Sequence, residues 1–109
     1  MTLTKSMKKD IVKHILEVVF DLAADSELHR ALSQNNLFTP ESMLSFPYDD
    51  YTTLDYEDTN KKVCTLKKGT VGLVKSFKAY VAYRNAIGQP IEDADWMQLT
   101  QDEFDKFRT

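Results

Sequence analysis

The sequence predicts a mainly α-helical fold: a small single-domain bundle of about five helices over residues 1–109, with a short β-hairpin around residues 54–66. Three patterns predict it. Apolar residues recur at three- and four-residue steps in two long segments. Capping residues precede three shorter segments. One central stretch contains two short strand-like strings separated by a turn sequence. With 109 residues, 42% of them hydrophobic, the chain can build one core and has little room for a second.

The first long helix is predicted over residues 6–24. Its apolar residues return to one broad face, which is typical of a helix lying on a core. Phe20 falls just outside that face, so it either meets a second packing partner or is partly exposed. The residues of the face are Met7, Ile11, Val12, Ile15, Leu16, Val18, Val19 and Leu22.

Two short helices follow. Ser26 is the expected N-cap of the first, and Asn35 and Asn36 are its expected stop. Thr39 is the expected cap of the second, with Pro40 at its first helical position. Both predictions depend on side chains that satisfy the free amides at the start of a helix.

The middle of the chain predicts a different element. The strings TLDYE and KVCTL flank the turn sequence DTNK, which indicates a two-stranded hairpin. A hairpin this small must lean on helices. The next long helix is predicted with Thr70 as its cap and a stop at Gly88 and Pro90. Its predicted buried stripe is Leu73, Val74, Phe77, Tyr80 and Val81.

The last helix is predicted from a capping box. Thr100 and Glu103 have the spacing at which each side chain satisfies a free backbone amide near the other. Leu99 and Phe104 have the spacing of a hydrophobic staple across the same turn.

No pattern in the chain indicates a chemistry. His14, His29 and Cys64 are the residues with catalytic potential, and they lie on three separate predicted elements. Packed side chains explain them better than a nucleophile and base do. The three glycines form no phosphate-binding loop, and one cysteine makes no zinc box. We therefore expect no enzyme activity, no metal, no cofactor and no small-molecule substrate.

The chain also lacks the patterns of a membrane or secreted protein. The apolar run over residues 11–24 is interrupted by charged residues, and no stretch approaches the roughly 20 apolar residues of a membrane span. A single cysteine excludes an internal disulfide. These features predict an intracellular protein without a membrane partner, cytoplasmic or nuclear.

The charges are distributed unevenly along the sequence. Residues 1–40 hold five basic and five acidic side chains; residues 41–60 hold six acids and no base; residues 61–91 hold seven bases and no acid; residues 92–109 hold six acids and two bases. The whole chain has a formal net charge of -3. The candidate binding residues are therefore Lys61, Lys62, Lys67, Lys68, Lys75, Lys78 and Arg84, and their candidate acidic complement is Asp49, Asp50, Asp55, Glu57 and Asp58.

Three hypotheses account for the basic segment. The first is internal neutralisation, with Asp55 and Glu57 placed across the hairpin from Lys61 and Lys62. The second is assembly, in which the acidic surface of one copy meets the basic surface of another. The third is RNA, where each lysine neutralises a phosphate; a negative net charge disfavours it.

Arg84 falls within the apolar stripe of its own helix. Its stem can pack there while its guanidinium reaches an acid beyond the turn, and we expect that acid to be Asp93 or Asp95.

Three strings together resemble a known family. LSQNNLFTPESML, LKKGTVGLVKSFKAYVAYRNAIGQPI and DWMQLTQDEFDKFR are similar to the N-terminal, Gag-like region of copia-type retrotransposon polyproteins from diatoms. The resemblance implies a structural role in particle formation or RNA packaging. The family's zinc knuckle, protease, integrase and reverse transcriptase have no counterpart here. A weaker similarity, of shape alone, is to helical interaction modules of the sterile-alpha-motif type.

The sequence therefore predicts a non-enzymatic module for protein interaction and self-association. RNA binding through residues 61–84 is the alternative.

Overall fold

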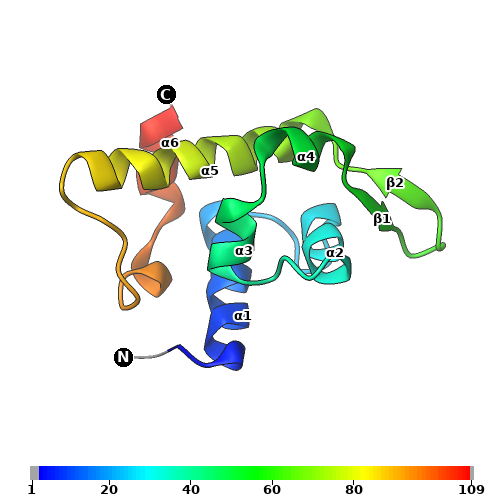
Figure 1. The fold of residues 1–109 in the computed structure, drawn as a ribbon, viewed down its shortest axis with the longest axis horizontal. Coiled ribbons are helices and arrows are strands. Elements are labelled where there is room, and N and C mark those ends of the chain that lie inside the picture. Colours follow the sequence, from blue (N-terminus) through cyan, green and yellow to red (C-terminus); the bar gives the residue numbers. More distant parts are fainter. Residues whose placement is uncertain (1–2, 109) are drawn as a thin grey trace.

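A computed structural model describes residues 3–108, which form six α-helices, a π-helical turn, a 3-10 turn and one two-stranded antiparallel hairpin. Figure 1 shows α5 running along the longest axis, α1 crossing below it and the hairpin projecting at one end. The elements are α1 (Lys5–His14), η1 (Ile15–Val19), α2 (Glu27–Gln34), α3 (Pro40–Ser45), α4 (Tyr48–Thr53), β1 (Asp55–Glu57), β2 (Val63–Thr65), α5 (Lys68–Ala86), η2 (Trp96–Gln98) and α6 (Gln101–Arg108).

The mainly helical class with a small hairpin is confirmed. The structure adds one helix, α4, that the sequence analysis missed. This helix has six residues and buries one side chain, Tyr51, so it is too short to produce an apolar period. Asp49 and Asp50 occupy its first turn, where negative charge is favourable to a helix.

The first helix ends earlier than predicted, because its last part is a π-helical turn. The Phe20 amide donates to the carbonyl of Ile15 at 2.9 Å, and Asp21 then takes a positive φ of 57°. This wider turn leaves Val18 45% exposed, although the pattern placed it on the apolar face. Phe20 meets a second packing partner, since its ring centroid lies 5.5 Å from that of Phe77.

The core is built around the inner face of α5. Phe77 is fully buried, and four aromatic rings surround it at centroid distances of 5.5 to 6.4 Å. They belong to Tyr80 of the same helix and to Phe20, Trp96 and Phe104 of other segments. Aromatic pairs at such distances add to the stabilisation from buried area. Of the predicted stripe of α5, Val74, Phe77 and Tyr80 are buried and Leu73 and Val81 are partly buried. Val71, which the stripe omitted, is also buried.

Of the four predicted N-terminal helix caps, three are confirmed and Thr70 is wrong. The hydroxyls of Ser26 and Thr39 accept hydrogen bonds from the amides of His29 and Ser42, at the starts of α2 and α3. Thr70, however, lies inside α5, which begins at Lys68 after an N-cap residue, Lys67, that has no capping side chain. The hydroxyl of Thr70 donates to the carboxylate of Glu27 instead.

The hairpin is confirmed, but its register differs from the expected one. Asp55 lies opposite Thr65, and Glu57 lies opposite Val63, so neither acid faces Lys61 or Lys62 across the strands. The reason is the turn, which extends to residue 62 and has Lys61 at a positive φ of 60°. The predicted cross-strand charge pairs are therefore wrong.

The C-terminal region follows the prediction closely. Gly88 has a φ of 73° beyond the end of α5, a left-handed conformation that favours glycine. The hydroxyl of Thr100 accepts from the amide of Glu103 at 3.2 Å, which is half of the predicted capping box. Glu103 does not complete the box, because its carboxylate accepts from the hydroxyl of Tyr80 at 3.4 Å. Leu99 and Phe104 are both buried.

Candidate interaction surface

The turn of the hairpin is organised by one carboxylate. Asp58 Oδ1 accepts hydrogen bonds from the backbone amides of Asn60 at 2.8 Å and Lys62 at 2.9 Å. The bond from the Lys62 amide is the main cause that lowers the pKa of Asp58 below its usual value, and the nearby Lys62 ammonium acts in the same direction. The Asp58 carboxylate therefore accepts hydrogen bonds within the turn, while the side chains of Lys61 and Lys62 are exposed.

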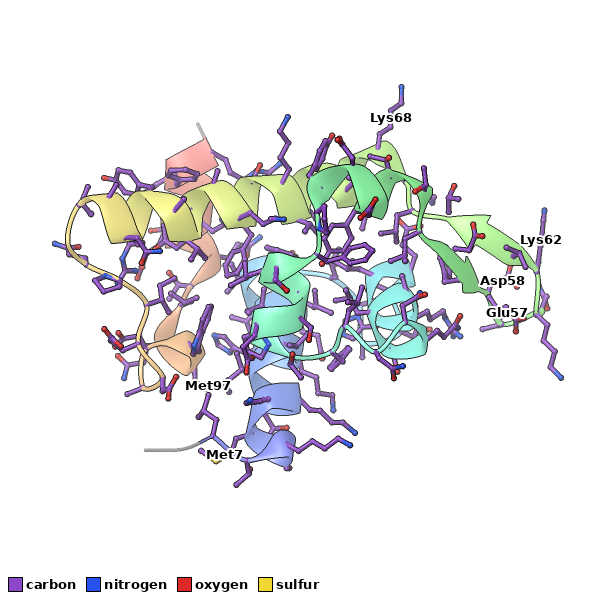
Figure 2. All side chains as sticks on the ribbon, viewed as in Figure 1. Met7, Glu57, Asp58, Lys62, Lys68 and Met97 are labelled. Carbon is purple, nitrogen blue, oxygen red and sulfur yellow. The ribbon has the colours of Figure 1, made fainter. Side chains whose placement is uncertain are left out.

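The start of α5 is positively charged in a position that helices disfavour. Lys67 is the N-cap residue and Lys68 the first helical residue, both are exposed, and the first turn contains no acid. The N-terminus of a helix already carries partial positive charge, so these lysines add to it. Figure 2 shows Lys68 extending away from the start of α5 and Lys62 extending from the hairpin. The acid at this helix start comes from α2: the Glu27 carboxylate accepts from the Lys67 amide and the Thr70 hydroxyl.

Two of the candidate lysines instead contact α4 and the segment that precedes it. The ammonium of Lys78 donates to the carbonyl of Phe46 at 2.6 Å. The ammonium of Lys75 lies 4.8 Å from the ring centroid of Tyr48, a distance at which a cation and an aromatic face attract each other. These two lysines hold α4 against α5.

Arg84 also has an internal role, but not the predicted one. Its Nε donates to the carbonyl of Gln89 at 2.7 Å, and a terminal nitrogen donates to the hydroxyl of Tyr80 at 3.1 Å. Asp95 accepts from the amide of Glu92 instead of pairing with it. The predicted partners Asp93 and Asp95 are therefore wrong, because the loop after α5 brings a carbonyl, not a carboxylate, to the guanidinium.

Within residues 3–108, no carboxylate lies within ion-pair distance of any of the seven candidate bases. The ion pairs in this part of the chain are Lys8–Glu41, Glu17–His29 and Asp102–Lys106. Internal neutralisation by ion pairing therefore does not account for the basic segment. Four of its lysines, Lys61, Lys62, Lys67 and Lys68, point side chains into solvent near the hairpin and the start of α5.

The acidic candidates lie in the same region of the molecule. Asp49 and Asp50 are exposed on α4, which packs along α5. Asp55 and Glu57 are exposed on the outer face of β1. Exposed charges of both signs therefore occupy α4, the hairpin and the start of α5, which we call the mixed-charge surface.

Glu27 positions this surface, and the sequence analysis missed it. Its carboxylate accepts from the hydroxyls of Tyr56 and Thr70 and from the amide of Lys67. Burial, with the Glu27 carboxylate close by, raises the pKa of Tyr56 above its usual value. One side chain of α2 thus joins β1 to the beginning of α5. Its partners are 29 to 43 residues away in the chain, so no local pattern could have indicated it.

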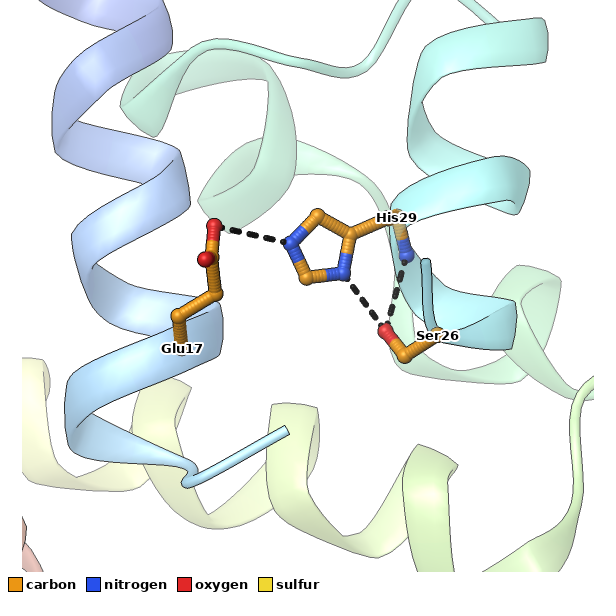
Figure 3. A network of polar contacts seen from close by, with 3 residues as sticks. All are labelled: Glu17, Ser26 and His29. Carbon is orange, nitrogen blue, oxygen red and sulfur yellow. Dashed lines mark hydrogen bonds and ion pairs between the residues drawn. The ribbon is translucent and has the colours of Figure 1, made fainter. Parts of the chain in front are cut away.

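A second polar cluster joins α2 to the π-helical turn (Figure 3). The ring of His29 has its Nδ1 2.6 Å from the hydroxyl of Ser26 and its Nε2 3.3 Å from the carboxylate of Glu17. The serine oxygen also serves as the N-cap of α2, and His29 is 7% exposed. A neutral imidazole in this position can accept from the serine and donate to the glutamate. The second histidine, His14, bonds to the carbonyl of Leu99 at 2.8 Å.

Two hollows on the surface are lined by residues that belong to neither cluster. One, of about 560 Å³, runs beside α1 and is lined by Lys5, Lys9 and Lys13 among others. The other, of about 380 Å³, includes Leu3, Leu44 and Trp96. Over residues 3–108, no three His, Cys, Asp or Glu side chains are grouped so that they could hold a metal ion. No helix in that same range is both long and apolar enough to cross a membrane.

Comparison with known proteins identifies no relative. No protein-family model matches the chain, and neither a curated protein nor a solved structure is significantly similar to it.

Proposed function

We propose that this domain is a non-enzymatic module for protein interaction and assembly, acting in the cytoplasm or the nucleus. Its lysines dock acidic protein surfaces, in the first place on another copy of the chain. The resemblance to Gag-like regions implies a structural role in particle formation, with which assembly agrees, or a role in RNA packaging. One observation carries the proposal: Lys61, Lys62, Lys67 and Lys68 are exposed, and within residues 3–108 none of their ammonium groups forms an ion pair with a carboxylate.

The mixed-charge surface supports self-association in particular. A two-fold interface must be complementary to itself, because the same patch contributes from both copies. The exposed acids on α4 and β1 lie near the exposed lysines, because β1 pairs with β2 and α4 packs along α5. A two-fold rotation can place the lysines of each copy against the acids of the other. Such charge complementarity favours association and fixes the relative orientation of the two copies.

RNA binding remains the alternative, and the same lysines are the reason. Positive charge at the start of a helix attracts any anion, including phosphate. The net charge of -3 opposes approach to a polyanion over longer distances, so the protein partner is the better supported of the two.

Charge reversal at two exposed lysines tests the proposal. Lys62→Glu with Lys68→Glu should weaken self-association severalfold, measured by light scattering or sedimentation over a concentration series. These positions are better than Lys75 and Lys78, whose contacts to α4 would confound the result with folding. Lys5→Glu with Lys9→Glu, on the exposed side of α1, is the matched control of equal charge change.

Adding Asp49→Lys and Asp50→Lys to the reversed protein should partly restore association. A wild-type domain that stays monomeric at high concentration, yet shifts single-stranded RNA with a steep salt dependence, would reject assembly in favour of RNA.

A further inference from the structure

The two edges of the hairpin differ in how their backbone groups are used. The amide of Asp58 donates to the carbonyl of Lys62, so residues 58 and 62 form a hydrogen-bonded pair. Such pairs alternate along an antiparallel ladder. With Tyr56 opposite Cys64, the backbone groups of residues 56 and 64 point inward, and those of residues 55, 57, 63 and 65 point outward.

The outward edge of β1 is closed by side chains of α2. The amide group of Gln34 donates to the carbonyl of Glu57 at 2.8 Å and accepts from its N–H at 2.7 Å, as a neighbouring strand would. Asn35 donates to the carbonyl of Asp55 at 3.0 Å. No further strand can pair on this side without displacing these side chains.

The outward edge of β2 is open. Val63 is 61% exposed and Thr65 is exposed, and within residues 3–108 neither residue has a hydrogen-bond partner for its outward N–H or C=O. A row of unpaired backbone groups on an exposed edge is a template for another strand. The side chains of Val63 and Thr65 share the outer face of the hairpin, so an added strand would lie beside one apolar and one β-branched polar residue.

The lysines around this edge decide which strand can pair with it. Lys61 and Lys62 precede β2, and Lys67 and Lys68 follow it. If two β2 strands paired antiparallel about Cys64, Lys61 of one copy would lie opposite Lys67 of the other. Like charges opposite each other are unfavourable, whereas acids at both ends of an incoming strand would be attracted. The lysines therefore repel the same edge of a second copy and favour an acidic strand.

We propose that the open edge of β2 binds a short extended acidic segment of a partner protein, which adds to the hairpin as a third strand. Main-chain hydrogen bonds to Val63 and Thr65 would supply affinity. Specificity would come from carboxylates at both ends of the segment, facing the four lysines, and from an apolar or β-branched residue beside Val63. This inference rests on the proposed function, because it uses the same lysines, and it adds the conformation and composition of the partner.

Amide hydrogen exchange tests the inference without changing the protein. The probe is a fluorescently labelled peptide, Asp-Glu-Val-Thr-Val-Glu-Asp, compared with one in which proline replaces both valines, whose N–H groups would face Val63 and Thr65. We expect the amides of Val63 and Thr65 to exchange rapidly in the free domain and to become protected at least about tenfold with the first peptide. The amide of Cys64, which faces β1, should be protected in both states.

Proline at residue 65 provides an independent test. Thr65→Pro removes an outward donor and leaves the ladder to β1 intact, since proline is tolerated on strand edges where the missing N–H faces solvent. It should weaken peptide binding at least about tenfold, whereas Thr65→Val should retain binding. Circular dichroism and the melting temperature verify the fold of both variants. If Thr65→Pro does not fold, the exchange measurement alone decides.

The outcomes separate this inference from the proposed function. Peptide binding that depends on Lys62 and Lys68, but protects neither Val63 nor Thr65, would overturn the added strand and support acidic docking. Equal binding of the proline-containing peptide, or no binding of either peptide, would also overturn the added strand. The proposed function is tested separately, by measuring the self-association of the charge-reversal variants.

Discussion

Tyr51, a residue of α4, supplies a hydrogen-bond donor that is missing at the end of α3. The carbonyl of Met43 would ordinarily accept from the amide four residues later, but that residue is Pro47, which has no N–H. The buried hydroxyl of Tyr51 donates to this carbonyl instead, at 2.5 Å. Burial raises the pKa of Tyr51 far above its usual value, because the anion would lose its solvation.

Tyr51→Phe should therefore destabilise the domain by about 1–3 kcal/mol at neutral pH, since it leaves a buried carbonyl without a donor. The pH dependence has a definite sign. The folded state keeps the phenol protonated, while the unfolded state loses the proton above about pH 10. The stabilisation is thus complete below about pH 10 and declines as the pH rises further.

Urea denaturation of the wild type and Tyr51→Phe at neutral pH and above about pH 10 measures both effects. The alkaline decline should be smaller in the variant. It should not vanish, because the pKa of Tyr56 is raised too. An unchanged stability at neutral pH would show that Tyr51 does not supply the missing donor.

At this scale, sequence reasoning succeeded where the partner is local and failed where it is distant. Ser26 and Thr39 cap amides three residues away, and a capping pattern includes that spacing. Glu27 bonds to Thr70, and Lys78 to the carbonyl of Phe46, which lies 32 residues away. Those pairings exist only after the chain has folded, so no window of the sequence contains them.

The final helix, α6, offers the clearest test of a single element. Thr100 caps it through the amide of Glu103, and Phe104 is buried against the aromatic core. Thr100→Ala should cost on the order of 1 kcal/mol, because one amide loses its acceptor. Thr100→Ser, which keeps the hydroxyl, is the matched control.

Thermal or urea unfolding of both variants measures that cost. If Thr100→Ala and the wild type unfold at the same midpoint, the cap does not contribute to folding and the helix frays from its first turn.

Element boundaries were less predictable than element types. The apolar face of the first helix continues to Leu22, yet the helix ends after the π-helical turn at Val19. Such a turn inserts one extra residue between hydrogen-bonded groups, so it shifts the face without leaving a mark in the composition. The shift places Phe20 against Phe77 and Glu17 against His29. Tertiary packing, not local preference, selects it.

At the scale of the whole molecule, the uneven charge of the sequence becomes a surface feature and not an internal network. The segment counts located the bases and acids along the chain, and only the hypothesis of internal neutralisation required neighbours in sequence to pair. The turn of the hairpin occupies Asp58, α4 holds Lys75 and Lys78, and the remaining lysines face solvent. The charge pattern alone predicts which segments carry the exposed charges. The open edge of β2 can be recognised only from the register of the two strands.

This division of roles predicts different salt responses for folding and for association. The core is apolar, and each of the three ion pairs within residues 3–108 has at least one partly exposed member, so each contributes only about 0–1 kcal/mol. Raising sodium chloride from low to roughly physiological concentration should change the free energy of unfolding by less than about 1 kcal/mol. Self-association, which depends on exposed lysines and acids, should weaken over the same range.

Urea denaturation and sedimentation of the same samples make the comparison. The variant with Lys62→Glu and Lys68→Glu should lose the salt response of association, while its free energy of unfolding stays within about 1 kcal/mol of the wild type, because an acid at the start of α5 is mildly favourable. A fall of several kcal/mol in folding stability as salt is added would contradict this division, because it would mean that the charges hold the fold together and are not available to a partner.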